Sequence, residues 1–120
     1  MDSLEEEISG EYHKGKHDRI VKQLEQRLQD SRLYDTVRHN MEYCNEYRGK
    51  YGKVDVIARG GSRYLAFEVK SSIRHYRKAY KQLDWMGHFI KDHYTRDCNV
   101  YKFFVYGVGK NDSFKIKMSW

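Results

Sequence analysis

The sequence lacks the features of a secreted, membrane-inserted or cross-linked protein. Its 120 residues include no proline and two cysteines, too few for a disulfide scaffold or a cysteine-rich metal cluster, so we expect a reducing cytoplasm. No stretch approaches the ~18 consecutive apolar residues of a membrane span. Residues 1–13 hold five acids and no lysine or arginine, the reverse of the basic start of a signal peptide.

Basic charge dominates the remainder of the chain. The net charge is +6, and because residues 1–13 carry −5, residues 14–120 carry +11. Such a balance favours a polyanionic partner, most simply nucleic acid, although solubility alone is the other explanation. We expect residues 1–13 to form an acidic, flexible arm and residues 14–120 to form a single domain, which is long enough for one core.

Apolar periodicity predicts the order helix, strand, hairpin, helix, strand, strand. The expected elements are a helix over 14–30, a strand over 33–38, a loop or irregular strand over 40–52, a hairpin of 53–58 and 63–70, a helix over 73–94, and strands over 100–108 and 114–118. The expected buried stripes are Ile20, Val21, Leu24 and Leu28 in the first helix, and Tyr76, Tyr80, Leu83, Gly87, Ile90 and Tyr94 in the second. This order indicates an α/β fold with a central mixed β-sheet flanked by helices.

The hairpin gathers charged residues on one face. A turn centred on Gly60-Gly61 would place Asp55 opposite Ala66, and Glu68 and Lys70 would then share the face of Asp55, because strand side chains alternate. The residues expected on the other face are apolar: Val54, Val56, Leu65, Phe67 and Val69. In this register Asp55 and Glu68 form a diagonal pair about 7–8 Å apart, close enough for their carboxylates to reach one ion.

Two carboxylates on rigid strands suit a hard divalent cation. Asp55 and Glu68 offer oxygen ligands for Mg²⁺ or Mn²⁺, and the backbone carbonyl of Val69 can add a third. Such an ion lowers the pKa of bound water and balances charge on a phosphate. Lys70 would orient the water and stabilise the negative transition state. The alternative is a surface ion pair with Lys70, worth ~0–1 kcal/mol.

The same residues resemble the PD-(D/E)XK nuclease superfamily. The similarity lies in Gly52-Lys53-Val54-Asp55-Val56-Ile57-Ala58, the twelve residues between Asp55 and Glu68, and Glu68-Val69-Lys70, and it is greatest to archaeal Holliday-junction resolvases and short bacterial members. It implies a restriction-endonuclease-like core, metal ligation by Asp55 and Glu68, a water-positioning Lys70 and phosphodiester hydrolysis. Val54 departs from the proline that many members have, and Lys53 from the glutamate of the short bacterial proteins.

Many members add a Glu or His from the first helix to the metal site. The candidates here are His17, Asp18 and Glu25. His17 lies near the centre of the expected buried stripe, whereas Asp18 and Glu25 lie roughly 90° away, so we favour His17 as the ligand. A satisfied core histidine is the alternative. His13 shares this side of the helix and is a candidate second ligand. Imidazole ligation would let Mn²⁺ serve at least as well as Mg²⁺.

A basic stretch follows the hairpin. Residues 70–81 contain no acid, and four cations lie opposite the expected buried stripe. We expect this face to follow a phosphate backbone, with a solvated basic face as the alternative. The candidate DNA-binding residues are Ser71, Arg74, Arg77, Lys78, Lys81 and Gln82. Ser71 is also a candidate helix cap, Gln82 resembles a glutamine of RecB-like nucleases, and Trp85 is the expected contact of a homodimer, since resolvase-like members act as two-fold dimers.

The leading hypothesis is a Mg²⁺- or Mn²⁺-dependent DNA endonuclease of repair or recombination, with junction resolution as one form of the activity. A RecB-like exonuclease or single-strand nuclease is an alternative within the class. A non-catalytic nucleic-acid-binding domain and a partner-binding domain on the same fold are alternatives outside it. The location would be the cytoplasm, or the host cytoplasm for a viral protein. The motif does not identify the form of DNA that is cut.

Overall fold

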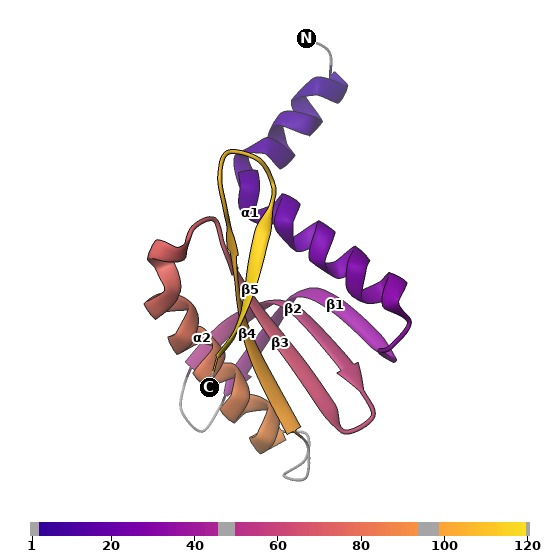
Figure 1. The fold of residues 1–120 in the computed structure, drawn as a ribbon, viewed down its shortest axis with the longest axis vertical. Coiled ribbons are helices and arrows are strands. Elements are labelled where there is room, and N and C mark those ends of the chain that lie inside the picture. Colours follow the sequence, from indigo (N-terminus) through magenta and orange to yellow (C-terminus); the bar gives the residue numbers. More distant parts are fainter. Residues whose placement is uncertain (1–2, 46–49, 94–98, 120) are drawn as a thin grey trace.

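The computed structural model describes residues 3–45, 50–93 and 99–119, and side chains within 15–42, 53–90 and 99–118. It confirms an α/β fold with a five-stranded mixed sheet and two main helices (Figure 1). In chain order the elements are α1 (Ser3–Ser31), β1 (Thr36–Asn45), β2 (Lys50–Gly60), β3 (Arg63–Lys70), the short 3₁₀ helix η1 (Ile73–His75), α2 (Tyr76–His93), β4 (Asn99–Gly107) and β5 (Phe114–Ser119). The side chains of His13 and Tyr94 lie outside the described residues.

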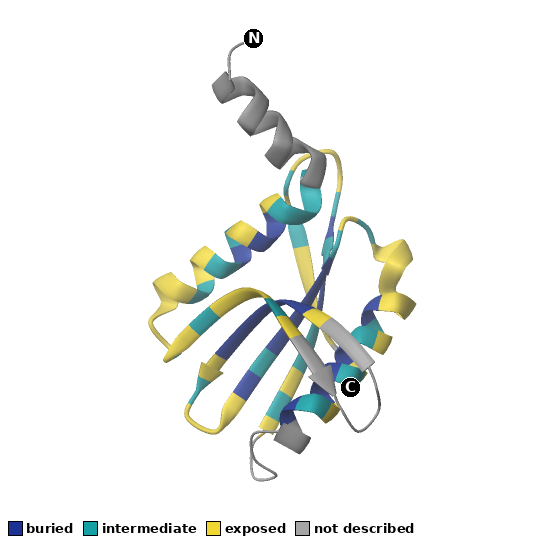
Figure 2. Cartoon of the chain, turned by 180° about the vertical axis from the view of Figure 1, so that it is seen from behind, coloured by how far each residue is buried: buried dark blue, intermediate teal, exposed yellow. Residues whose placement is uncertain are grey.

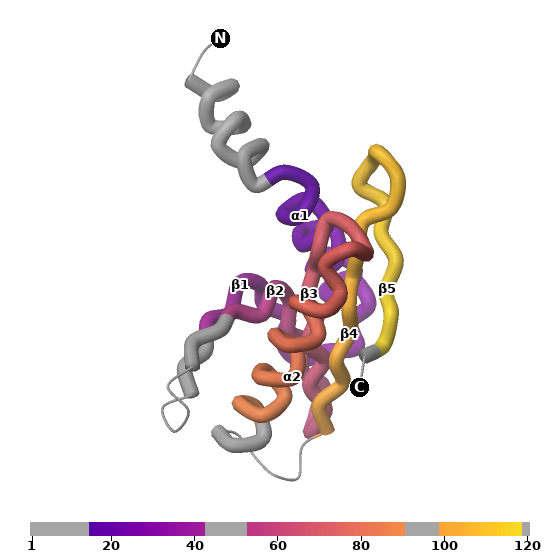
Figure 3. Tube along the Cα trace, turned by 90° about the vertical axis from the view of Figure 1, so that its left-hand side faces the viewer, coloured from indigo at the N-terminus to yellow at the C-terminus, as the bar shows by residue number. Residues whose placement is uncertain are grey.

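The strands follow one another across the sheet in the order β1-β2-β3-β4-β5. Every neighbouring pair is antiparallel except β3 and β4, which run parallel. A parallel pair needs a long crossover, and α2 provides it between β3 and β4. The tube in Figure 3 lets the reader follow this crossover from the end of β3 through α2.

The two helices pack on opposite faces of the sheet and create two apolar cores. Alternate residues of β3 separate them, because Phe67 and Val69 belong to the core beneath α1 whereas Ala66 belongs to the core beneath α2. The α1 core also contains Ile20, Val21, Leu24, Val56 and Val105. The α2 core also contains Val54, Ile57, Tyr64, Leu83, Met86 and Ile90. Figure 2 shows the buried residues concentrated in the central strands and on the inner sides of the helices.

Helix α1 begins earlier than predicted and bends at Gly15. The sequence predicts a helix over 14–30, but the backbone is helical from Ser3. Gly15 interrupts it with φ 63° and ψ −147°, a conformation open to glycine and strained for other residues. After this bend the helix axis changes direction, and the segment that follows carries His17 and the apolar stripe. No helix in the described ranges is long and apolar enough to span a membrane.

Strand β1 corrects the expectation for residues 33–52. The sequence predicts a strand over 33–38 and a loop or irregular strand over 40–52, but one strand runs from Thr36 to Asn45, with a positive φ at Asn40, and β2 already begins at Lys50. Residues 36–45 are polar, and their pairing with β2 makes them a strand in spite of that composition. Strand pairing is a tertiary contact, so local sequence carries little signal of it.

The hairpin register is also corrected. Gly60 pairs with Arg63, so the turn is formed by Gly61 and Ser62, and Gly61 has the positive φ of 62° that such turns require. Ile57, not Asp55, lies opposite Ala66. Continuing this register places Asp55 directly opposite Glu68 instead of diagonal to it. The shift is two residues, an even number, so by itself it does not change the face on which a side chain of the hairpin lies.

The alternation of faces along β2 breaks at Asp55. Val54 belongs to the α2 core and Val56 to the α1 core, although a straight strand would place both on one face as the sequence predicts. Asn40, which faces Asp55 across the β1–β2 pair, has a φ of 50°. The change of face along β2 therefore falls at Asp55, the residue that carries the carboxylate.

Helix α2 is shorter than the predicted helix over 73–94, because η1 replaces its first turn. Ser72, not Ser71, caps this turn by accepting a hydrogen bond from the amide of Arg74. Leu83, Gly87 and Ile90 are buried as predicted, but Tyr76 is 42% exposed and Tyr80 is half-buried. The buried stripe instead includes Ala79 and Met86.

Candidate metal and catalytic site

Two carboxyl groups lie inside the protein where β2 meets β3. Asp55 is 4% exposed and Glu68 is 2% exposed, and they are the buried charged residues of the described chain. Burying a carboxylate is costly unless partners compensate for the lost water. A pair of buried acids at one point of a sheet is therefore a candidate functional site.

Asp55 takes the place of a backbone acceptor in the β2–β3 ladder. The last regular pair of this ladder is Val56 with Phe67, and beyond it the amide of Val69 donates to Oδ2 of Asp55 at 2.8 Å. Asp55 and Glu68 are also joined by a hydrogen bond between their side chains. The carboxyl groups are thus fixed by rigid strands and by each other.

The pKa values of the two acids are shifted in opposite directions. The pKa of Glu68 is raised to about 9, first by burial and then by the hydrogen bond and negative charge of Asp55, while Lys70 acts to lower it. Burial also acts to raise the pKa of Asp55, but hydrogen bonds from His17, Glu68 and the Val69 amide outweigh it and lower that pKa. The directions of the two pKa shifts favour a protonated Glu68 beside an ionised Asp55 at neutral pH.

His17 is the first-helix residue that reaches the carboxyl pair. Its Nε2 lies 3.2 Å from Oδ1 of Asp55, and its Nδ1 lies 2.8 Å from Oδ1 of Asp18. The hydrogen bond with Asp55 is the largest influence on its pKa, which is raised, although burial acts to lower it. Of the three candidates, Asp18 contacts His17 and Glu25 lies 2.6 Å from Nδ1 of His39, so His17 is the one in contact with Asp55; its role as a metal ligand stays a prediction.

Lys70 completes the group. Its Nζ lies 3.5 Å from Oε2 of Glu68, and its side chain is half-buried. Asp55, Glu68, Lys70 and His17 are therefore together, as the sequence predicts. The carbonyl role expected for Val69 stays a prediction, since the contact that the structure gives is through its amide.

Sequence reasoning missed Lys16, the neighbour of His17 in the chain, which packs against Gly107 at the end of β4. A Cβ added to Gly107 would meet Lys16 Cε and the Ser71 carbonyl oxygen, each at 2.6 Å, so only glycine leaves room for this lysine. Lys16 Nζ donates to the carbonyl oxygen of Gly109 at 2.7 Å. The contact joins residues 93 positions apart, and no local pattern could have indicated it.

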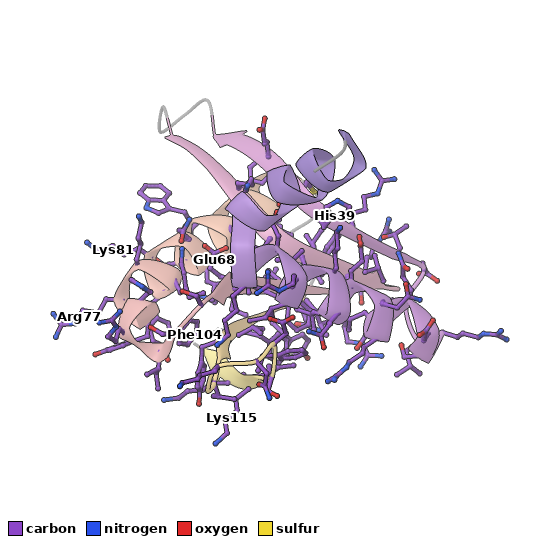
Figure 4. All side chains as sticks on the ribbon, turned by 90° about the horizontal axis from the view of Figure 1, so that it is seen from above. His39, Glu68, Arg77, Lys81, Phe104 and Lys115 are labelled. Carbon is purple, nitrogen blue, oxygen red and sulfur yellow. The ribbon has the colours of Figure 1, made fainter. Side chains whose placement is uncertain are left out.

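The expected DNA-binding residues lie along the end of β3 and the first half of α2. Arg74, Arg77, Lys78 and Lys81 are exposed, as is Ser71, whereas Gln82 is half-buried. Figure 4 shows Arg77 and Lys81 projecting outward from α2, with Glu68 further inward in that view. Trp85 and Phe89 pack against the α2 core, which covers part of each ring.

The oxygen and nitrogen atoms of Asp55, Glu68 and His17 suit a hard divalent cation, but they are not arranged around a common point as metal ligands. Among the side chains that the structure describes, no group of three or more His, Cys, Asp and Glu residues is arranged to hold a metal ion. The carboxyl groups of Asp55 and Glu68 instead bond to each other through a proton. Two oxygen ligands and one imidazole remain an appropriate chemistry for Mg²⁺ or Mn²⁺ once that proton leaves.

The chain matches no family model, and no curated protein or solved structure is significantly similar to it.

Proposed function

We propose that the protein is a divalent-metal-dependent DNA endonuclease on a restriction-endonuclease-like core, of the PD-(D/E)XK type that its hairpin resembles. The observation that carries this proposal is the buried pair Asp55 and Glu68, with His17 and Lys70 in contact with it. A buried acid with a pKa of about 9 costs stability, and such costs are typical of functional sites. Apolar residues at both positions would avoid this cost, but the amide of Val69 would then lose the Asp55 oxygen to which it donates.

Each residue of the site has a chemical role in this proposal. Asp55, Glu68 and His17 would hold Mg²⁺ or Mn²⁺, and the Val69 carbonyl is expected to add an oxygen. A bound ion would supply a water of lowered pKa and charge balance for the phosphate. Glu68 loses its proton when it becomes a ligand, because a carboxylate must be ionised to bind a cation. Asp18 holds the imidazole of His17 through Nδ1, so that Nε2 faces Asp55.

Lys70 acts on the reacting phosphate in this proposal. With Glu68 engaged in ligation, the ammonium group 3.5 Å away is placed to orient the attacking water and to offset negative charge in the transition state. Its stem is half-buried, which limits the positions that the ammonium group can adopt. A lysine held in this way costs little reorganisation during the reaction.

DNA is the proposed substrate because the exposed cations of α2 follow directly after Lys70 in the chain. Arg74, Arg77, Lys78 and Lys81 offer a face for a phosphate backbone. Cleavage of a four-way junction, exonuclease action of the RecB-like kind, a homodimer and a cytoplasmic location remain predictions that the resemblance or the composition motivates.

A second candidate is a nucleic-acid-binding domain without catalysis. The observation that favours it is that no three-residue metal-ligand group is formed among the described side chains. In that case the proton between Asp55 and Glu68 would be permanent. Such a domain would bind DNA equally well with and without a divalent cation.

One experiment separates the two candidates. Supercoiled plasmid, linear duplex, single strand and a synthetic junction are each incubated with EDTA, Mg²⁺ or Mn²⁺. The nuclease proposal expects products only with a divalent cation and none from the purified Asp55→Asn variant. DNA binding without any product in either cation would support the binding domain instead. Products that persist in Asp55→Asn preparations purified in parallel would contradict the assignment of the site.

A further inference from the structure

A pocket lined by two arginines lies further along β2, beyond the carboxyl pair. Its volume is about 280 Å³, and its lining residues are Thr36, Arg38, Met41, Ile57, Arg59 and Tyr64. Arg59 is four residues after Asp55 on the same strand, which corresponds to roughly 13 Å of extended chain. The pocket shares no lining residue with the carboxyl site, so it is a separate feature.

Arg59 is held in place by two contacts. Its Nε donates to the carbonyl oxygen of Gly61 at 3.2 Å, and its guanidinium carbon lies 5.6 Å from the centre of the Tyr64 ring. Stacking on an aromatic ring restricts a guanidinium group while leaving its outer nitrogens open to a ligand. The side chain is exposed, so these nitrogens face solvent.

Arg38 is the diagonal neighbour of Arg59. Arg38 pairs with Ile57 and Arg59 pairs with Thr36, which places the two arginines on one face about 7–8 Å apart. Among the side chains that the structure describes, no carboxylate lines the pocket, and the nearby Asp35 accepts the amide of Gly61 in the turn. Two cations on one pocket repel each other unless an anion lies between them.

The remaining lining residues suit a ligand with both an anionic and an apolar part. The hydroxyl of Thr36 adds a donor, while Ile57, which is buried, and Met41, which is half-buried, provide an apolar floor. A phosphate group accepts several hydrogen bonds and is matched by the forked donors of arginine. A nucleotide unit carries such a phosphate together with a sugar and a base.

We propose that the pocket formed by Arg38 and Arg59 binds a phosphate of a nucleic-acid strand outside the carboxyl site. The proposal extends the proposed function, since it names a second contact for the strand, but it does not need the protein to cleave. A free nucleotide offers the same phosphate chemistry, and the experiment distinguishes it from a strand.

The test compares Arg38→Gln and Arg59→Gln in the full chain with the matched control Lys117→Gln. Lys117 is an exposed cation on β5 outside the pocket, so its substitution removes the same charge elsewhere. Binding of a short fluorescent single strand and of its duplex is measured by anisotropy over a salt series in EDTA. We expect each arginine variant to weaken binding by about tenfold and to reduce the salt slope by about 1, and the control to change neither.

Nuclear magnetic resonance titrations with a mononucleotide and with inorganic phosphate test the pocket when no strand binds. Shifts confined to Thr36, Arg38, Arg59 and Tyr64 with the mononucleotide alone would replace the strand by a free nucleotide and overturn that part of the proposal. Arginine variants that match Lys117→Gln in strand binding, together with no shift at the pocket, would overturn it entirely. Retained metal-dependent cleavage in that case would leave the proposed function standing, so the two failures are distinguishable.

Discussion

The middle and the end of β2 place opposite charges in opposite surroundings. Asp55 is buried between the helices and bonded to Glu68, whereas Arg59, four residues later, is exposed beside a pocket. A buried carboxyl group can change its protonation state, and the raised pKa of Glu68 is the result. An arginine stays charged, so it is useful only where an anion or water can reach it. The β2–β3 hairpin therefore carries both a group that titrates, Glu68, and a group that does not, Arg59.

The largest expected effect is a difference in cleavage activity between variants of Asp55 and of Arg59. Asp55→Asn should abolish metal-dependent cleavage, because an amide is a poor ligand for a hard cation, whereas Arg59→Gln should weaken binding and leave cleavage measurable. Asparagine keeps an oxygen that can accept the Val69 amide at the position of Oδ2, so the fold should survive. Cleavage assays with Mn²⁺ and thermal unfolding measure both. Equal loss of cleavage in the two variants would contradict the assignment of Asp55 to the cleavage site and of Arg59 to a separate binding pocket.

The second effect concerns stability without metal. A pKa raised from 4.5 to about 9 means that the folded protein binds a proton at Glu68 that the unfolded chain releases. This contribution to stability therefore declines as the pH rises from about 4.5 to 9 and is constant above that. Glu68→Gln mimics the protonated acid, so it should raise the unfolding free energy at pH 7 by about 2–3 kcal/mol and remove this slope.

Chemical denaturation in EDTA across this pH range measures the effect of Glu68→Gln. The matched control is Asp84→Asn, whose side chain is 67% exposed and should change stability little. A destabilised Glu68→Gln protein with an unchanged pH slope would show that Glu68 is ionised in the folded protein, against the pKa described above.

The third effect tests how Asp18 orients the imidazole of His17 beside the carboxyl pair. Asp18→Ala removes the acceptor at Nδ1 of His17 and should weaken Mn²⁺ binding by about tenfold, since partners of a ligating histidine contribute on that scale. Calorimetry measures the affinity, and ¹⁵N chemical shifts of the imidazole report which nitrogen carries the proton. Asp30→Ala on the same helix is the control. Unchanged affinity together with unchanged imidazole shifts would remove Asp18 from the site.

The smallest effect belongs to the exposed face of α2. Arg77→Gln and Lys81→Gln should each weaken duplex binding a few-fold and reduce the salt slope by about 0.9, because each removes one phosphate contact. Neither should alter stability, since both side chains are exposed. Salt-dependent anisotropy measures the slope. A slope that does not change in the double variant would show that DNA lies elsewhere, for example along the pocket of Arg38 and Arg59.

Local pattern was enough to predict most of the elements and the main members of the site. Alternation along residues 63–70 predicts the face that Glu68 and Lys70 share, and helical phase selects His17 over its neighbours. An error of two residues in the register did not matter to the faces, because the period of a strand is two. The extent of β1 was predicted only in part, as a strand over 33–38 and a loop or irregular strand over 40–52, since its pairing with β2 is what makes Thr36–Asn45 one strand.

The sequence by itself determined which residues are charged, which are apolar, and on which face of a helix or strand each must lie, because these follow from the covalent periods of the backbone. Tertiary structure alone decided the change of face along β2 at Asp55, the contact of Lys16 with Gly107, and the burial that raises the pKa of Glu68. All three depend on segments far apart in the chain being brought together, and the energy of burial exists only after that has happened.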